Sequence, residues 1–158
     1  MSNQDTPTLS FPKDEKLRHK SLVDALFKTG KSFYEFPLRA TWRKISAEDL
    51  NSNFRDHVPQ GIGPIQLLIT IPKKKRKKAV DRVLLRRRIR EAYRLNRLEL
   101  KQALEQDKDL GTFSLALVYI HNQNLPYQII EEKIRKILKK LQATALEPAS
   151  ACKQPSTN

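Results

Sequence analysis

The sequence is poor in the residues on which many small catalytic and extracellular domains depend. It has one cysteine, Cys152, and four glycines in 158 residues. One thiol cannot form an intrachain disulfide framework or a cysteine-based zinc site, so a reducing, cytoplasmic setting is expected. The few glycines fit none of the glycine-rich nucleotide-binding motifs. No apolar run approaches the roughly 18 residues of a membrane span, and the first residues lack the apolar stretch of a signal peptide.

Catalytic side chains are also scarce. The three histidines, His19, His57 and His121, occur in three separate segments without the spacing of metal ligands. No serine has the sequence context of a nucleophile. The sequence therefore predicts no catalytic residue and no metal site in the protein itself.

Positive charge is what the sequence has in excess. Lysine and arginine number 31 against 17 acids, a formal net charge of +14. Residues 73–97 hold 13 of these basic residues and only two acids, whereas the other 133 residues hold 18 basic and 15 acidic groups. A solubilising surface would mix the two signs, because like charges such as Arg86 and Arg90 repel each other four residues apart on a helix. Such a concentrated field binds polyanions through phosphate contacts, for which the arginine fork is well shaped.

The chain divides into a domain over residues 13–142 and two flexible tails, residues 1–12 and 143–158. The first expected helix has Ser21 as its N-cap and ends at Gly30. Residues 46–63, rich in polar residues, proline and glycine, are expected to form a loop. In chain order, periodicity predicts a helix over 21–30, strands over 33–45 and 65–71, a helix over 79–106, a strand over 112–121 and a helix from Pro126.

This α-β-β-α-β-α order predicts an α+β fold, a small two-layer sandwich with helices on a sheet of three or four strands. The long helix has two faces. Apolar residues such as Leu85 and Ile89 lie on one, and arginines from Arg82 to Arg97 lie on the other, with Val83 among them. The arginine face and the six basic residues before it are expected to bind the phosphates of a nucleic acid.

A second candidate surface lies on the polar side of the strand over 33–45. Arg39, Thr41 and Arg43 share that side, and Phe27 of the first helix would lie near them if the sandwich closes normally. A groove with basic groups and an aromatic ring suits single-stranded nucleic acid. A plain exposed strand face explains the same pattern, and the residues alone leave both interpretations open.

Residues 73–94 resemble the signature of the bacterial ribonuclease P protein subunit. That signature is a basic pair after a strand, followed by K-A-V-x-R-N-R-x-K-R-x-x-R-E-A-x-R. The matching residues are Lys78, Ala79, Val80, Arg82, Arg87, Arg90, Glu91, Ala92 and Arg94, with Arg86 in place of the lysine. Val83 and Leu84 depart from the signature, which has asparagine and arginine there.

The resemblance implies a non-catalytic subunit of an endoribonuclease. In that family a catalytic RNA uses Mg²⁺, held by the RNA and its substrate, to remove the 5′ leader from precursor tRNA. The implied partners are the catalytic RNA subunit and precursor tRNA, with no membrane. The family also implies a left-handed βαβ crossover, in the fold type of a small-subunit ribosomal protein domain. The implied RNA-binding residues are Lys73, Lys74, Lys75, Lys77, Lys78, Arg82, Arg86, Arg87, Arg90 and Arg94, and the implied leader-binding residues are Phe27, Arg39 and Thr41.

Other functions are compatible with parts of the sequence. A ribosomal-type protein that binds ribosomal RNA would have a similar charge and fold. A protein-only nuclease would need acids or histidines that converge on a metal. A DNA-recognition helix would need asparagine or glutamine on its exposed face, which is here almost uniformly basic.

Overall fold

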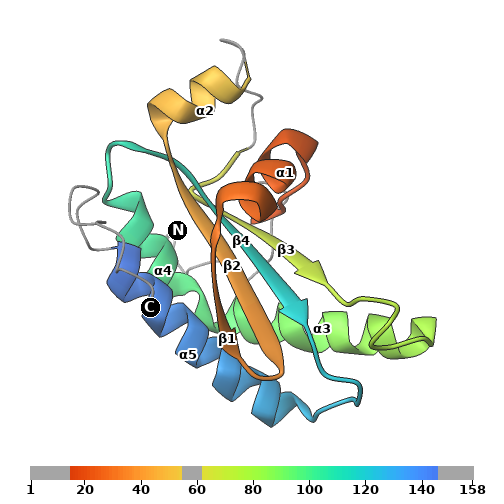
Figure 1. Cartoon of the computed structure of the whole chain (residues 1–158). Coiled ribbons are helices and arrows are strands. Elements are labelled where there is room, and N and C mark those ends of the chain that lie inside the picture. Colours follow the sequence, from red (N-terminus) through yellow and green to blue (C-terminus); the bar gives the residue numbers. More distant parts are fainter. Residues whose placement is uncertain (1–14, 55–61, 146–158) are drawn as a thin grey trace, which may run out of the picture.

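The computed structural model describes residues 15–54 and 62–145, which form an α+β fold around one four-stranded sheet (Figure 1). The expected tail over residues 1–12, and His57 and Cys152, lie outside the described residues. The strands are β1 (Lys31–Glu35), β2 (Leu38–Ser46), β3 (Ile65–Thr70) and β4 (Leu110–Tyr119). Their order across the sheet is β1-β2-β4-β3, and only the β3–β4 pair is parallel.

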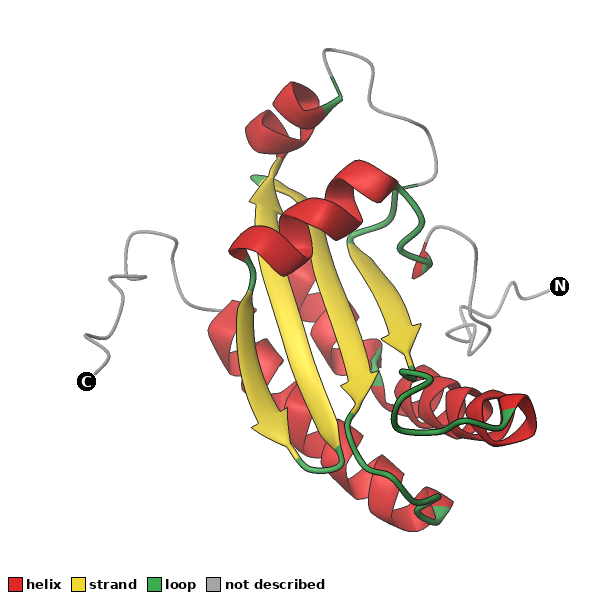
Figure 2. Ribbon diagram, turned by 45° about the vertical axis from the view of Figure 1, so that its right-hand side comes forward, coloured by secondary structure: helices red, strands yellow, loops and turns green. Residues whose placement is uncertain are grey.

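Helices lie on both faces of the sheet (Figure 2). One face is covered by α3 (Ala79–Asn96), α4 (Leu98–Glu105) and α5 (Tyr127–Ala145). The other face is crossed by α1 (Lys20–Thr29), with the short α2 (Ala47–Asn53) beside it. The predicted α+β sandwich is confirmed, with α1 added on the second face of the sheet.

The central strand β4 supplies the core on both faces. Phe113, Leu115 and Leu117 point toward α3, α4 and α5 and are fully buried. Ala116, between them, points toward α1. Its small side chain lets α1 approach the sheet closely. The prediction of a central strand from its two apolar faces is confirmed.

The crossover from β3 to β4 is left-handed, as the resemblance implies. Both strands point toward the lower right in Figure 1, and the chain passes behind the sheet through α3 and α4 between them. Viewed from the helix side with the strands pointing upward, β4 lies to the left of β3. Most βαβ connections have the opposite hand.

The first helix and the first strand differ in detail from the prediction. Helix α1 has His19, not Ser21, at its N-cap, and it ends at Gly30 as expected. A β-carbon on Gly30 would lie 2.3 Å from the carbonyl oxygen of Leu26, so no larger residue fits there without a shift. The single strand predicted over 33–45 is a hairpin of β1 and β2 that turns at Phe36–Pro37. Proline cannot donate to a strand ladder, which explains the break.

The loop predicted over 46–63 is partly wrong. Residues 47–53 form α2, because the Ser46 side chain caps its first turn by accepting a hydrogen bond from the Asp49 backbone N–H at 3.1 Å. Residues 55–61 lie outside the described residues. At the other end of the chain, α5 continues to Ala145, so the tail expected from residue 143 begins in helix.

The helix predicted over 79–106 is two helices that meet at Arg97. Arg97 was expected on the basic face, yet its side chain is buried. Its Nε lies 2.6 Å from the carboxylate of the fully buried Glu15, which also accepts from Lys101 at 2.9 Å. Tyr93 is buried in α3 one turn earlier, and burial raises the pKa of its hydroxyl. A contact with the far N-terminal segment thus takes Arg97 out of the exposed set.

Candidate nucleic-acid interface

A cationic surface extends from the loop before α3 to the middle of that helix. We call it the basic surface, and it consists of Lys73, Lys74, Lys75, Lys77, Lys78, Arg86, Arg87 and Arg90. Every member is exposed except Arg86, which is half-buried. Among the described residues, none of the eight side chains makes a hydrogen bond or ion pair within the protein. These cations are therefore available to an external anion.

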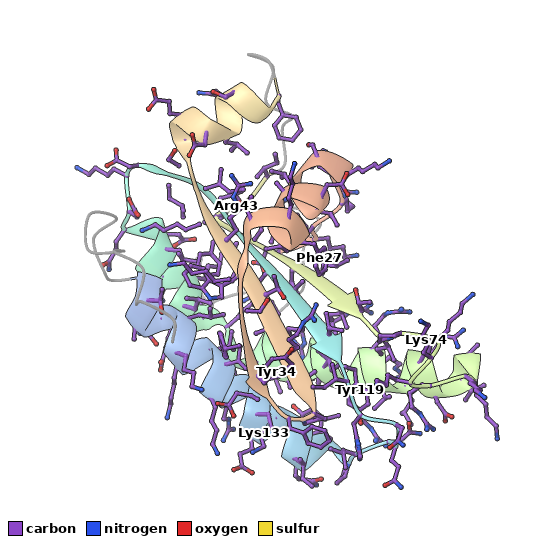
Figure 3. The ribbon with its side chains drawn as sticks, in the orientation of Figure 1. Phe27, Tyr34, Arg43, Lys74, Tyr119 and Lys133 are labelled. Carbon is purple, nitrogen blue, oxygen red and sulfur yellow. The ribbon has the colours of Figure 1, made fainter. Side chains whose placement is uncertain are left out.

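The buried side of α3 holds this surface rigidly. Leu85, Ile89 and Ala92 are fully buried against the sheet and α5. Burying side chains of the size of Leu85 and Ile89 contributes roughly 1.5–3 kcal/mol each. The exposed arginines consequently project from a fixed helix, and the loop with Lys74 lies next to the helix start, at one end of the sheet (Figure 3).

Two arginines expected to bind RNA are engaged within the protein. Arg82 donates to the backbone carbonyls of Arg76 and Lys77 at 3.0 and 2.8 Å. Arg94 forms a two-pronged contact with Glu91, at 2.6 and 3.1 Å. The hydrogen bond from Arg94 lowers the pKa of the Glu91 carboxyl and raises the pKa of Arg94. The structure separates these two arginines from the basic surface.

The second candidate surface is the sheet face that α1 only partly covers. Phe27, near the end of α1, is 45% exposed, and Arg39 on β2 is half-buried. Thr41 lies on the same face, but it is only 3% exposed and its hydroxyl is 2.9 Å from that of Ser32. Phe27 and Arg39 can be reached from solvent, whereas Thr41 helps to join β1 to β2.

An exposed tyrosine on this face was missed from the sequence. Tyr34 pairs with Arg39 across the β1–β2 hairpin, so it shares that residue's face, and it is 64% exposed. A single strand over 33–45 would put Tyr34 on the apolar side, with Leu38. The turn at Pro37 reverses that side, and a proline inside a strand pattern was the signal for it. We call the solvent-accessible side chains of Phe27, Tyr34 and Arg39 the aromatic surface.

Within 15–54 and 62–145, no three histidine, cysteine or acidic side chains come together in a way that could hold a metal ion. No helix in these two ranges is both long enough and apolar enough to cross a membrane.

The ribonuclease P family model matches residues 11–142, which include both surfaces. The chain belongs to the ribonuclease P protein family. Ribonuclease P protein components from two strains of Porphyromonas gingivalis are each 29% identical to it, and one of these alignments covers 93% of this chain and 96% of the relative.

Solved structures agree on the fold. The Staphylococcus aureus RNase P protein has a TM-score of 0.56 at 15% identity, and the match covers 84% of this chain and 98% of that one. The Thermotoga maritima RNase P protein has a TM-score of 0.55 at 22% identity, with 80% and 96% covered.

The two departures from the family signature differ in their surroundings. Val83, in the place of asparagine, is 52% exposed and lies one helical turn before Arg86 and Arg87 of the basic surface. It offers this surface an apolar contact instead of an amide. Leu84, in the place of arginine, is half-buried. The basic surface of this chain is therefore less polar at its centre than the signature specifies.

Proposed function

We propose that this protein assists a catalytic RNA in removing the 5′ leader from precursor tRNA. The observation that carries the proposal is the basic surface: eight cations on a fixed helix and its loop, without an internal anionic partner among the described residues. Membership of the ribonuclease P family supports the RNA subunit as the partner that this surface binds. The cytoplasmic setting belongs to the same proposal.

The proposed mechanism is electrostatic. A catalytic RNA must fold and also hold a second polyanion, so the two backbones repel each other. Cations on a rigid helix reduce that repulsion without the loss of conformational entropy that a flexible tail would suffer. We propose that Mg²⁺ is held by phosphates of the RNA and its substrate, where it supplies an activated water and stabilises the leaving oxygen. The protein's residues bind and orient the RNA and donate no catalytic group.

The aromatic surface is proposed to hold the single-stranded leader. Phe27 and Tyr34 offer rings on which bases can stack. Arg39 of β2 lies opposite Tyr34 of β1 on the same face of the sheet. The Nε of Arg39 is buried, and within the described part of the chain no group accepts a hydrogen bond from it. A phosphate oxygen of the leader can fill this role. Thr41 is too deeply buried to contact the leader directly.

Cleavage of precursor tRNA at low magnesium tests the main proposal. The RNA subunit from the same organism is assayed with and without this protein. We expect strong stimulation by the protein and no cleavage by the protein alone, because screening the RNA backbones replaces part of the magnesium requirement. If the protein binds ribosomal RNA tightly and does not stimulate cleavage, the ribosomal function replaces this one.

Replacement of Tyr34 by alanine tests whether the aromatic surface binds the leader. Loss of one stacked base weakens binding by roughly 1–3 kcal/mol. We expect that loss for precursor tRNA with a leader, and no change for the same tRNA without one, measured by equilibrium binding to the holoenzyme. Tyr34→Phe keeps the ring and should bind as the unaltered protein does. An equal loss with the leaderless tRNA would show that Tyr34 does not contact the leader.

A further inference from the structure

One of the two acids in residues 73–97 lies close to the run of six basic residues. Asp81 is the only acid in the first turn of α3, three residues after Lys78, the last of six consecutive basic residues. An acid at that position interacts favourably with the helix dipole. Charge alone, however, makes it a poor neighbour for an RNA backbone. Its contacts point to another role.

Both carboxylate oxygens of Asp81 are engaged, and each joins a different loop. Oδ2 accepts from Arg76 Nη2 at 2.7 Å, and Arg76 belongs to the loop of residues 73–78. Oδ1 accepts from Asn124 Nδ2 at 3.0 Å, and Asn124 belongs to the loop between β4 and α5. Hydrogen bonding by Asn124, with Arg76 close by, lowers the pKa of the Asp81 carboxyl. Asp81 is thus ionised at neutral pH and connects the two loops.

Further contacts close the same network. Arg76 also donates to the backbone carbonyl of Asn122, so it spans from Asp81 to the neighbouring loop. Arg82 donates to the carbonyls of Arg76 and Lys77, which fixes the loop from the helix side. The loop is held at four points, and all of its lysines remain exposed.

Without such contacts the loop would not keep one shape. Six adjacent cations repel one another, and charged segments of this kind extend and fluctuate. A mobile loop loses conformational entropy when it binds, which weakens the complex. Arg76 is the one cation of the six whose side chain turns inward to the network, and it is half-buried.

We propose that Asp81 is a positioning residue for RNA binding: it holds Arg76 and the loop of residues 73–78 against the β4–α5 loop, so that the five lysines face the RNA together. This inference rests on the proposed function of the basic surface. Asp81 then strengthens RNA binding through its contacts, although its negative charge by itself weakens binding.

The opposite signs make the proposal testable with Asp81→Asn. Removing a negative charge beside the lysines strengthens RNA binding if charge alone matters. If Asp81 positions the loop, binding weakens by about three- to ten-fold because the lysines must be ordered on binding. Affinity for the ribonuclease P RNA subunit is measured by titration at several salt concentrations. Tighter or unchanged binding by Asp81→Asn overturns the proposal.

Two further variants separate position from charge and from folding. Glu99→Gln removes one charge from the exposed face of α4, where Glu99 has no hydrogen bond or ion pair to the described residues, and it should bind slightly more tightly. Asn124→Ala breaks the network with no change in charge, and it should weaken binding as Asp81→Asn does. Normal binding by Asn124→Ala also overturns the proposal.

Failure of this inference differs from failure of the proposed function. If the unaltered protein does not bind the RNA subunit, the basic surface is not its RNA site and both fail. If it binds and Asp81→Asn binds equally well, only the positioning role fails. Hydrogen exchange of the backbone amides in residues 73–78 gives an independent measurement, and Asp81→Asn should speed it while the exchange of α5 is unchanged.

Discussion

Replacing Arg86, Arg87 and Arg90 together by alanine is expected to weaken binding to the ribonuclease P RNA subunit by roughly a hundredfold or more. Each arginine is available to an external phosphate, and a hydrogen bond to a charged group contributes about 1.5–3 kcal/mol. Even about 1 kcal/mol for each of the three gives this effect, since every 1.4 kcal/mol is a tenfold change. Equilibrium titration of the labelled RNA subunit measures the loss.

The fold should survive this triple substitution. Alanine is the best helix former, and removing Arg86 and Arg90 relieves a like-charge repulsion. The three side chains do not belong to the core clusters, and none of them is bonded within the described part of the protein. A melting temperature at or slightly above that of the unaltered protein is therefore expected, so that lost binding is not lost folding.

A matched triple variant on α5 distinguishes the basic surface from net charge. Arg135, Lys136 and Lys139 are exposed on α5, and their replacement by alanine also removes three positive charges. The α3 variant should reduce the slope of log affinity against log salt by about two to three, because three lost phosphate contacts no longer release their condensed counterions. The α5 variant should change it little. Equal losses from both variants, or retained substrate affinity and magnesium dependence in the α3 variant, would contradict the proposed role.

Local pattern was enough to predict much of this fold and the larger candidate surface. The apolar β4 and the basic face of α3 follow from side-chain spacing within one element, so sequence periodicity contains them. Arg87 and Arg90 are where the helical wheel puts them, exposed and on one side. The family signature added the left-handed crossover, which no local pattern contains.

The missed features depend on contacts that the spacing of side chains along one element does not show. The hairpin turn at Pro37 moves Tyr34 to the face of Arg39, and only the pairing of β1 with β2 reveals it. Arg82 and Arg94 look identical to Arg87 in sequence, but they bond to the loop and to Glu91. A charge pattern identifies a cationic helix, and it does not say which of its arginines already have partners.

One contact between residues far apart in the sequence joins the N-terminal segment to the α3–α4 junction. Glu15 is fully buried between Arg97 and Lys101. Two residues later, the Leu17 backbone N–H donates to the carbonyl of Leu67 on β3 at 3.0 Å. The segment therefore runs beside β3 and leads into α1. The Glu15–Arg97 pair thus helps to hold the segment that leads into α1, the helix that carries Phe27.

Replacement of Glu15 by alanine is expected to lower the free energy of unfolding by about 3–5 kcal/mol, because it leaves the buried Arg97 guanidinium without its carboxylate. Urea denaturation followed by circular dichroism measures the change. Glu132→Ala is the matched control: its i,i+4 pair with Lys136 joins two exposed side chains, and such a surface pair contributes less than about 1 kcal/mol. A loss for Glu15→Ala no larger than for this control would show that the buried pair does not hold the segment.

The double variant Glu15→Leu with Arg97→Met separates the buried charge from the connection that it makes. Apolar side chains of similar volume often match a buried ion pair in stability, so most of the lost unfolding free energy should return. Glu15→Ala should also weaken leader binding, because the segment that precedes α1 loses this contact, and the double variant should restore it by packing the segment against the helix junction again. If stability returned while the affinity for precursor tRNA with a leader stayed low, α1 would need the ion pair itself to set the position of Phe27, and apolar packing would not be sufficient.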